Sequence, residues 1–146
     1  MKKVRIKKLD SRAVAPQYAT EGSSGFDLVC LNDTSLPADT WRIIQTGLSF
    51  AIPEGFEMQI RSRSGSAVEH GLIVLNQPGT IDSDYRGPVG IIVWNITNVS
   101  VTVEAGTRIA QGIICPIERV EFEIVEELET TERGEGGFGS TGYVNF

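Results

Sequence analysis

Alternation of apolar and polar residues runs through most of this chain, and it is the feature that most limits the possible fold. A period of two places successive side chains on opposite faces of a β-strand, so each alternating segment is predicted to be a half-buried strand. Clear examples are residues 40–44, 56–60, 99–103 and 121–124. Two continuous apolar runs, residues 91–94 and 113–115, are predicted to be strands buried on both faces.

Turn signals rich in Asn, Asp, Gly and Pro separate these segments at short intervals. Only residues 66–70 look helical, and they span little more than one turn. At 146 residues the chain is long enough for one domain with a real core. The pattern therefore predicts an all-β sandwich or barrel of about ten short strands.

Charge and cysteine usage limit the classes of function. The net charge of −6 argues against non-specific nucleic-acid binding, and no apolar run approaches membrane-spanning length. The basic start, residues 1–9, alternates apolar and charged residues and is predicted to be an edge strand rather than a targeting signal. Cys30 and Cys115 lack metal-ligand spacing and are expected to be reduced core thiols. We expect a cytoplasmic protein without a nucleic-acid or membrane partner.

The C-terminal segment from Arg133 to Gly142 reads Arg-Gly-Glu-Gly-Gly-Phe-Gly-Ser-Thr-Gly. Its five glycines allow the backbone to approach a ligand closely, Arg133 and two hydroxyls suit phosphate oxygens, and Phe138 can stack on a base. Eight glutamates lie between Glu118 and Glu135, most of them before Arg133. Such an acidic run is expected for an extended, solvated tether that leads into the C-terminal segment. A disordered spacer is the alternative, but the residue order favours a mobile flap over a nucleoside triphosphate.

Four other segments concentrate polar groups: residues 24–28, 61–67, 79–87 and 108–111. Each also has a purely structural explanation, because Asp27 can cap backbone donors, the Arg-Ser turn can carry surface ion pairs, and Asp82 can form a turn. Together they supply guanidinium groups for phosphates, carboxylates for Mg²⁺ or for water activation, and a ring for the nucleoside. His70 is expected to be structural, which leaves Asp82 as the candidate that activates water.

These segments resemble, in order, the five motifs of the trimeric dUTPases. They read Ser24-Gly-Phe-Asp-Leu28, Arg63-Ser-Gly-Ser-Ala67, Gly79-Thr-Ile-Asp-Ser-Asp-Tyr-Arg-Gly87, Arg108-Ile-Ala-Gln111 and Arg133-Gly-Glu-Gly-Gly-Phe-Gly-Ser-Thr-Gly142. The resemblance covers nearly the whole chain, and the third and fifth motifs are the most specific. Ser66 stands where leucine is usual and Pro88 where a polar residue is common, which affects packing more than chemistry.

The resemblance implies a β-barrel-like jelly roll over residues 1–132 and a flexible arm over residues 133–146. It implies a homotrimer with shared active sites, with dUTP as substrate and Mg²⁺ as cofactor. The reaction would release dUMP and pyrophosphate, which keeps uracil out of DNA and supplies dUMP for thymidylate synthesis. The nearest alternative is a dCTP deaminase, which an ammonia assay would identify. A non-catalytic nucleotide-binding protein is the alternative from another class, which pyrophosphate release from dUTP would exclude.

The resemblance also implies roles for individual residues. Asp82 would activate the water and Gln111 would position water or phosphate, while Asp27 would hold the metal through its waters. Tyr85 would pack on the deoxyribose and exclude a 2′-hydroxyl. The remaining predicted substrate contacts come from the Arg-Ser turn, the main chain of the hairpin that reads uracil, and the arm, and they are Arg63, Ser64, Gly65, Asn76, Gly79, Gly90, Arg133, Phe138, Gly139, Ser140 and Thr141.

Overall fold

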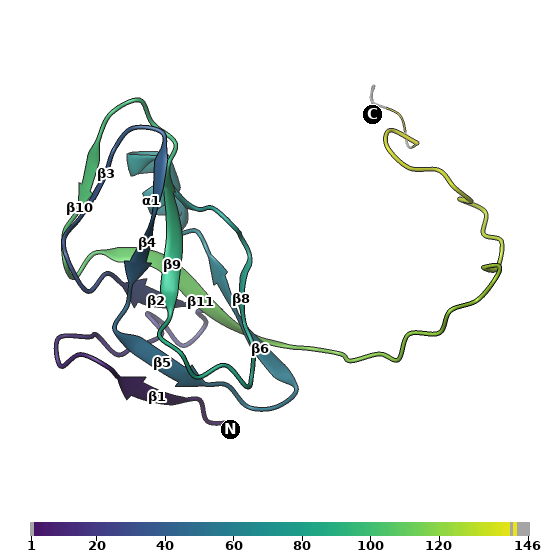
Figure 1. The fold of residues 1–146 in the computed structure, drawn as a ribbon, viewed down its shortest axis with the longest axis horizontal. Helices are drawn as coiled ribbons and strands as arrows, with labels where there is room; N and C mark the ends of the chain where they lie inside the picture. Colours follow the sequence, from purple (N-terminus) through teal and green to yellow (C-terminus); the bar gives the residue numbers. More distant parts are fainter. Residues whose placement is uncertain (1, 141, 143–146) are drawn as a thin grey trace.

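The computed structural model describes residues 2–140 and 142, and within them the chain forms eleven strands and one helix (Figure 1). In chain order the elements are β1 (Arg5–Lys8), β2 (Phe26–Val29), β3 (Thr34–Leu36), β4 (Thr40–Gln45), β5 (Leu48–Ala51), β6 (Phe56–Arg61), α1 (Ser64–His70), β7 (Leu72–Val74), β8 (Gly79–Ile81), β9 (Gly90–Asn95), β10 (Val101–Val103) and β11 (Arg108–Pro116). The predicted all-β architecture is confirmed. The basic edge strand at the N-terminus is present as β1.

Two sheets build the body of the molecule. One has four strands in the order β2-β11-β6-β8, and the other has three in the order β4-β9-β7. The pairs β1-β5 and β10-β3 extend the structure, and every pairing is antiparallel. Because most neighbouring strands are distant in sequence, the chain crosses repeatedly between sheets, as in a jelly roll.

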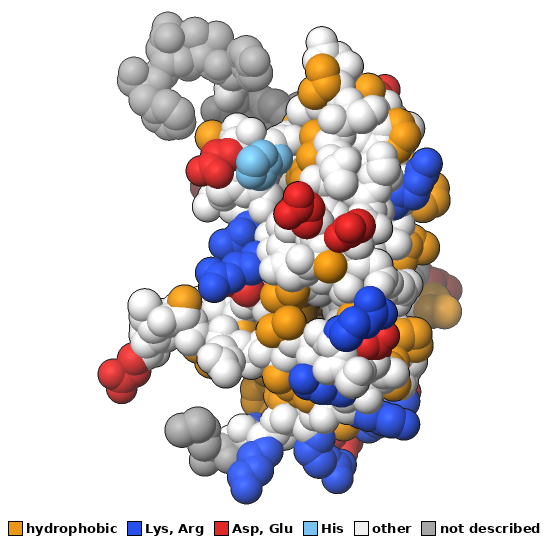
Figure 2. Space-filling view, turned by 90° about the vertical axis from the view of Figure 1, so that its left-hand side faces the viewer, with side chains coloured by type: hydrophobic (Ala, Val, Ile, Leu, Met, Phe, Trp, Pro, Cys, Tyr) orange, Lys and Arg blue, Asp and Glu red, His pale blue; other side chains and the backbone are white. Residues whose placement is uncertain are grey.

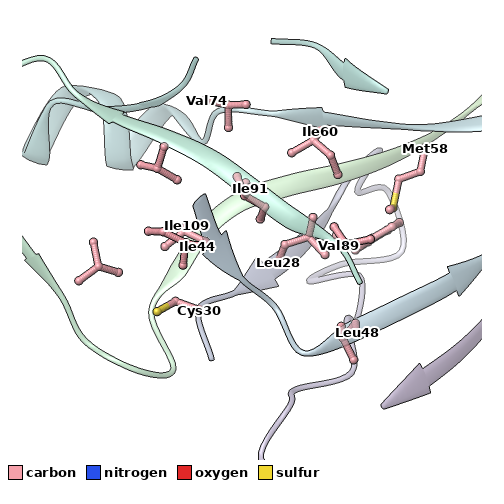
Figure 3. Packing of buried hydrophobic residues seen from close by; sticks show 14 of the residues in the cluster. Leu28, Cys30, Ile44, Leu48, Met58, Ile60, Val74, Val89, Ile91 and Ile109 are labelled. Carbon is pink, nitrogen blue, oxygen red and sulfur yellow. The ribbon is translucent and has the colours of Figure 1, made fainter. Parts of the chain in front are cut away.

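The hydrophobic core lies between these sheets. Leu28 and Met58 from the four-stranded sheet and Ile44 and Ile91 from the three-stranded sheet are all essentially inaccessible to solvent. Figure 3 shows side chains from both sheets, joined by Val89 ahead of β9, converging on one interior volume. Burial of each such side chain contributes about 1.5–3 kcal/mol, so the core supplies a rigid support for the surface loops.

The helix α1 follows β6 directly and ends at Gly71. Gly71 has a φ of 61°, and its amide donates to the carbonyl of Ala67. A Cβ at this position would also collide with the side chain of Thr97. A left-handed residue with no room for a side chain must be glycine, so Gly71 fixes where the helix stops.

The burial of two predicted strands differs from expectation. In β9 only alternate residues are buried, so Ile91 and Val93 face the core while Ile92 and Trp94 are half-buried on the outer face. Residues 113–115 are also only half-buried. The prediction of strands buried on both faces is therefore wrong, because only one face of each sheet packs on the core.

The segment 121–124 forms no strand. Beyond β11 the chain leaves the body in an extended path, and the alternating apolar side chains of this segment have no partner strand within the described residues (Figure 1). Phe122 and Ile124 are 91% and 99% exposed. The prediction that this segment is half-buried fails because a strand needs a neighbour to complete its hydrogen bonds.

Surface charge is polarised. Lys2, Lys3, Arg5, Lys7 and Lys8 are all exposed, and Figure 2 shows basic side chains gathered at the lower end of the molecule, where β1 lies in Figure 1. The acidic residues that follow β11 lie on the extended segment instead.

Among residues 2–140 and 142, no helix has the length and apolar character required to cross a bilayer.

Candidate active site

A polar hollow of about 400 Å³, here called the Arg63 hollow, collects three segments that are far apart in sequence. The start of β2 contributes Gly25 and Asp27, the beginning of α1 contributes residues 63–65, and β11 contributes Arg108 and Gln111. Strand register explains the assembly, because Gln111 pairs with Asp27 on one side and with Arg61 on the other. The hollow therefore sits where β2, β11 and β6 lie side by side.

Asp27 organises the charges of this hollow. Its Oδ1 accepts a hydrogen bond from Arg63 Nε at 2.7 Å, and its Oδ2 lies 3.4 Å from Arg108 Nη1. Arg63 Nη1 also donates to the main-chain carbonyl of Arg108 at 3.2 Å. One carboxylate thus holds two guanidinium groups in place and leaves a net positive charge, which suits a bound polyanion.

The amide of Gln111 is fixed at the edge of the same hollow. Its Nε2 donates to the main-chain carbonyl of Ser62 at 2.9 Å. A Cβ built on Gly25 would lie 2.8 Å from Gln111 Oε1, so the glycine provides the space that this oxygen occupies. Ser62 also accepts, through its hydroxyl oxygen, a hydrogen bond from the amide of Val74 at 2.8 Å, which anchors the turn before α1.

A second hollow of about 430 Å³, here called the Tyr85 hollow, lies beside the segment between β8 and β9 that the sequence predicts as part of a hairpin. Because β8 and β9 belong to different sheets, this segment, still called the hairpin below, is a loop between sheets rather than a paired hairpin. The hairpin contributes Asp82, Tyr85, Pro88 and Gly90 among its lining residues, and the outer face of the three-stranded sheet contributes the rest: Ile43, Gln45 and Ile92. The proposed base and the proposed sugar-packing ring therefore share one hollow. Asp82 itself is exposed.

The hairpin is held by a dense set of local hydrogen bonds. The Tyr85 amide donates to the Asp82 carbonyl at 3.2 Å, and the Tyr85 hydroxyl donates to the Pro88 carbonyl at 3.0 Å. Arg86 Nη1 donates to the carbonyls of Ser83 and Tyr85, and the Ser49 hydroxyl donates to the Arg86 carbonyl at 2.6 Å. A Cβ on Gly87 would overlap the Tyr85 ring. The Tyr85 ring consequently lies against the backbone of Gly87, and its orientation is fixed by this contact and by the hydrogen bond of its hydroxyl.

The other predicted site residues lie outside these two hollows. Asn76 is exposed, and its side chain lies beside the buried Gly79 at the base of the hairpin. Arg133, Phe138, Gly139 and Ser140 lie on the extended C-terminal segment and line neither hollow. Thr141 lies outside the described residues. The structure thus groups the first, second and fourth motifs, places Asp82 and Tyr85 of the third in a separate hollow, and leaves the assigned roles as predictions.

Two other reactive groups have unsuitable environments for catalysis. Burial raises the pKa of the Cys30 thiol above its ordinary value, which disfavours the nucleophilic thiolate. His70 is exposed in the last turn of α1, 3.9 Å from Glu69. Neither residue lines either hollow.

Sequence reasoning assigned no individual role to four residues that shape these hollows. Arg108 is the first residue of the fourth motif, and in the structure it shares Asp27 with Arg63. Ser62, which holds Gln111, and the pair Ile43 and Gln45, which line the Tyr85 hollow, were not singled out. A correct pairing of β4 with β9 would have placed Gln45 opposite Gly90, but the register is not encoded in either segment alone.

Comparison with known proteins agrees with this geometry. The family model described as dUTPase matches residues 11–142. The deoxyuridine 5′-triphosphate nucleotidohydrolase of Wolinella succinogenes is 48% identical over 96% of this chain and 94% of its own length. The enzyme of the same name from Nautilia profundicola is 49% identical over 96% of this chain and 99% of its own.

Solved structures give the same result. The dUTPase of Staphylococcus bacteriophage 80alpha with dUPNHPP superposes with a TM-score of 0.91 at 29% identity, covering 98% of this chain and all of the phage chain. The similarity therefore extends from the jelly-roll body into the C-terminal segment. On these grounds the chain belongs to the dUTPase family of dUTP-hydrolysing enzymes.

Proposed function

We propose that this protein hydrolyses dUTP to dUMP and pyrophosphate through attack of an Asp82-activated water on the α-phosphate. The observation that carries the proposal is the Arg63 hollow, where three motifs place two guanidinium groups and the Gln111 amide around one carboxylate. The chemistry of the Tyr85 hollow, a carboxylate beside an oriented ring, supports a nucleoside as the other half of the substrate.

In this mechanism the Arg63 hollow binds the phosphates, with Arg63, the Ser64 hydroxyl and the Gly65 backbone as donors. Asp82 accepts a proton from water while the water oxygen bonds to the α-phosphorus. The bond from that phosphorus to the α,β-bridging oxygen breaks, and pyrophosphate leaves. Gln111, whose Nε2 is already bound to Ser62, contributes an oriented amide beside the reacting phosphate.

The residues of the Arg63 hollow fit Mg²⁺ held mainly by the substrate. The described residues contain no group of three His, Cys, Asp or Glu side chains that could hold a metal ion. Asp27 is a single, partly exposed carboxylate already bound to two guanidinium groups, which suits contact through metal-bound water. When bound, Mg²⁺ would neutralise charge on the triphosphate oxygens.

A homotrimer with shared sites is part of the proposal. Asp82 and Arg63 line different hollows with no lining residue in common, so a site that uses both is readily completed by a second copy. Val120, Phe122 and Ile124 alternate with glutamates on the extended segment and are mostly exposed, as expected for a strand that pairs with another subunit.

The C-terminal arm would then close a neighbouring site. Its 14 residues from Arg133 reach at most roughly 45 Å, enough to span a small subunit. Phe138 would cover the base, while Arg133, Gly139, Ser140 and Thr141 would contact the terminal phosphates. Phe138 is fully exposed in the single chain, and an exposed large apolar ring is typical of a group that packs on a ligand or a partner, which supports this role. In the cell such an enzyme would keep uracil out of DNA and supply dUMP.

The decisive experiment replaces Asp82. Asp82→Asn preserves the shape of the side chain but replaces the carboxylate with an amide that cannot act as a base, so kcat for pyrophosphate release from dUTP should fall by about 10²-fold or more. Binding of dUMP, measured by calorimetry, should persist. Asp84→Asn, an exposed carboxylate two residues away in the same turn, is the matched control. Near-normal turnover of Asp82→Asn would remove Asp82 from the mechanism, and ammonia release from dCTP by the wild type would identify a deaminase instead.

A further inference from the structure

We propose that the side-chain amide of Gln45 contacts the edge of the substrate's base and contributes to its recognition, an inference that rests on the proposed function. No motif of the sequence contains Gln45. It lies on β4, outside the hairpin that carries Asp82 and Tyr85, and it lines the Tyr85 hollow together with them.

Strand register places this amide beside the backbone expected to read uracil. Gln45 pairs directly with Gly90 across β4 and β9. Because side chains alternate along a strand, Gln45 and Ile43 point to the same face as Gly90 and Ile92. All four residues line the hollow.

Gly90 leaves the space into which the amide reaches. A Cβ built on Gly90 would lie 3.0 Å from Gln45 Nε2 and 2.7 Å from Ile43 Cγ2. The Gln45 amide therefore covers the place where another residue would carry its side chain. A base bound against the Gly90 main chain would meet the amide at its edge.

The amide has hydrogen-bonding capacity to spare. Gln45 is exposed, its side chain makes no hydrogen bond to another protein group within the described residues, and the neighbouring walls from Ile43, Pro88 and Ile92 are apolar. An amide carries a donor and an acceptor side by side. Uracil presents the complementary pair, the O4 acceptor next to the N3–H donor, whereas cytosine presents an amino group next to a bare N3.

The amide of Gln45 and the rigid main chain are expected to contribute differently to base recognition. The amide can rotate by 180° and exchange its donor and acceptor to match cytosine, so it contributes affinity for either base. The fixed main chain contributes most of the discrimination between uracil and cytosine. A carboxylate at position 45 has no such freedom. It only accepts hydrogen bonds, so it would repel O4 and favour the cytosine amino group.

Two near-isosteric variants test the proposal. Gln45→Met keeps the bulk over Gly90 but removes the amide, so the KM for dUTP should rise about three- to tenfold with kcat within about twofold. Gln45→Glu should raise that KM further and lower the inhibition constant of dCTP relative to the KM for dUTP. Gln17→Met, an exposed glutamine that lines a different hollow, is the control. Melting temperature and elution volume are recorded for each variant.

A KM for dUTP unchanged in Gln45→Met would show that the side chain only fills space, and it would overturn the proposal. An unchanged ratio of dCTP inhibition constant to KM in Gln45→Glu would overturn it as well. A wild-type enzyme that fails to release pyrophosphate from dUTP would refute the proposed function and this inference together, whereas an active wild type with indifferent variants would refute the inference alone.

Discussion

At the scale of single residues, the environment of each carboxylate matches the role proposed for it. Asp27 lies between Arg63 and Arg108, so it orients the two guanidinium groups that are proposed to face the phosphates. Within the described chain, Asp82 has no ion pair and is exposed at the end of β8. Water can therefore reach the Asp82 carboxylate directly, as the proposed role in water activation requires.

Tyr85 offers a test of sugar selection at the same scale. Its ring lies against Gly87, and its hydroxyl is bound to the Pro88 carbonyl, so the ring is positioned before substrate arrives. Tyr85→Ala should lower the dUTP-over-UTP ratio of kcat/KM by about tenfold, because the wall against a 2′-hydroxyl is lost. Tyr85→Phe keeps that wall and should preserve the ratio within about threefold. Equal ratios in the wild type and Tyr85→Ala would assign ribose exclusion to another group.

At the scale of elements, Asn95 at the end of β9 ties two loops to the core. This fully buried amide donates through Nδ2 to the carbonyls of Leu36, Pro37 and Val99, and its Oδ1 accepts from the amide and hydroxyl of Thr97. The side chain of Asn95 thus links the ends of β3 and β9 to the turn that precedes β10.

Removal of this amide should destabilise the fold strongly. Asn95→Ala removes all five hydrogen bonds of a fully buried side chain and leaves a cavity in its place, so the free energy of unfolding should fall by about 2–4 kcal/mol. Urea unfolding at a fixed protein concentration, followed by tryptophan fluorescence, measures the change. Asn98→Ala, three residues along and exposed, should change stability by no more than about 0.5 kcal/mol. Similar losses in both variants would mean that the Asn95 network contributes little.

The same elements show how far sequence reasoning reaches. Alternation located β4 and β6 within a residue or two, because each strand buries one face, while β9 was located by its continuous apolar run. It failed for residues 121–124, where the pattern is genuine but the described chain contains no strand to pair with it. It also missed Gln45, since its position opposite Gly90 depends on a register between segments about 45 residues apart. Local pattern predicts strands; long-range pairing decides which side chains meet.

At the scale of the whole molecule, the separation of Asp82 from Arg63 predicts complementation between inactive copies. If each site takes Asp82 from one subunit and Arg63 from another, then Asp82→Asn and Arg63→Ala should each abolish activity alone. Equimolar unfolding and refolding of the two variants together should restore about a quarter of the wild-type rate, because half of the subunits carry each intact residue. Light scattering should give three times the mass of the 15.9 kDa chain.

The controls for this experiment follow from the same reasoning. Mixing the two variants without refolding should restore no activity until subunits exchange. Asp82→Asn that is unfolded and refolded alone should stay inactive. A trimer that regains no activity after co-refolding would mean that Asp82 and Arg63 of one copy act on the same nucleotide. The two hollows would then be the ends of a single groove within one subunit, and the arm alone would come from a neighbour.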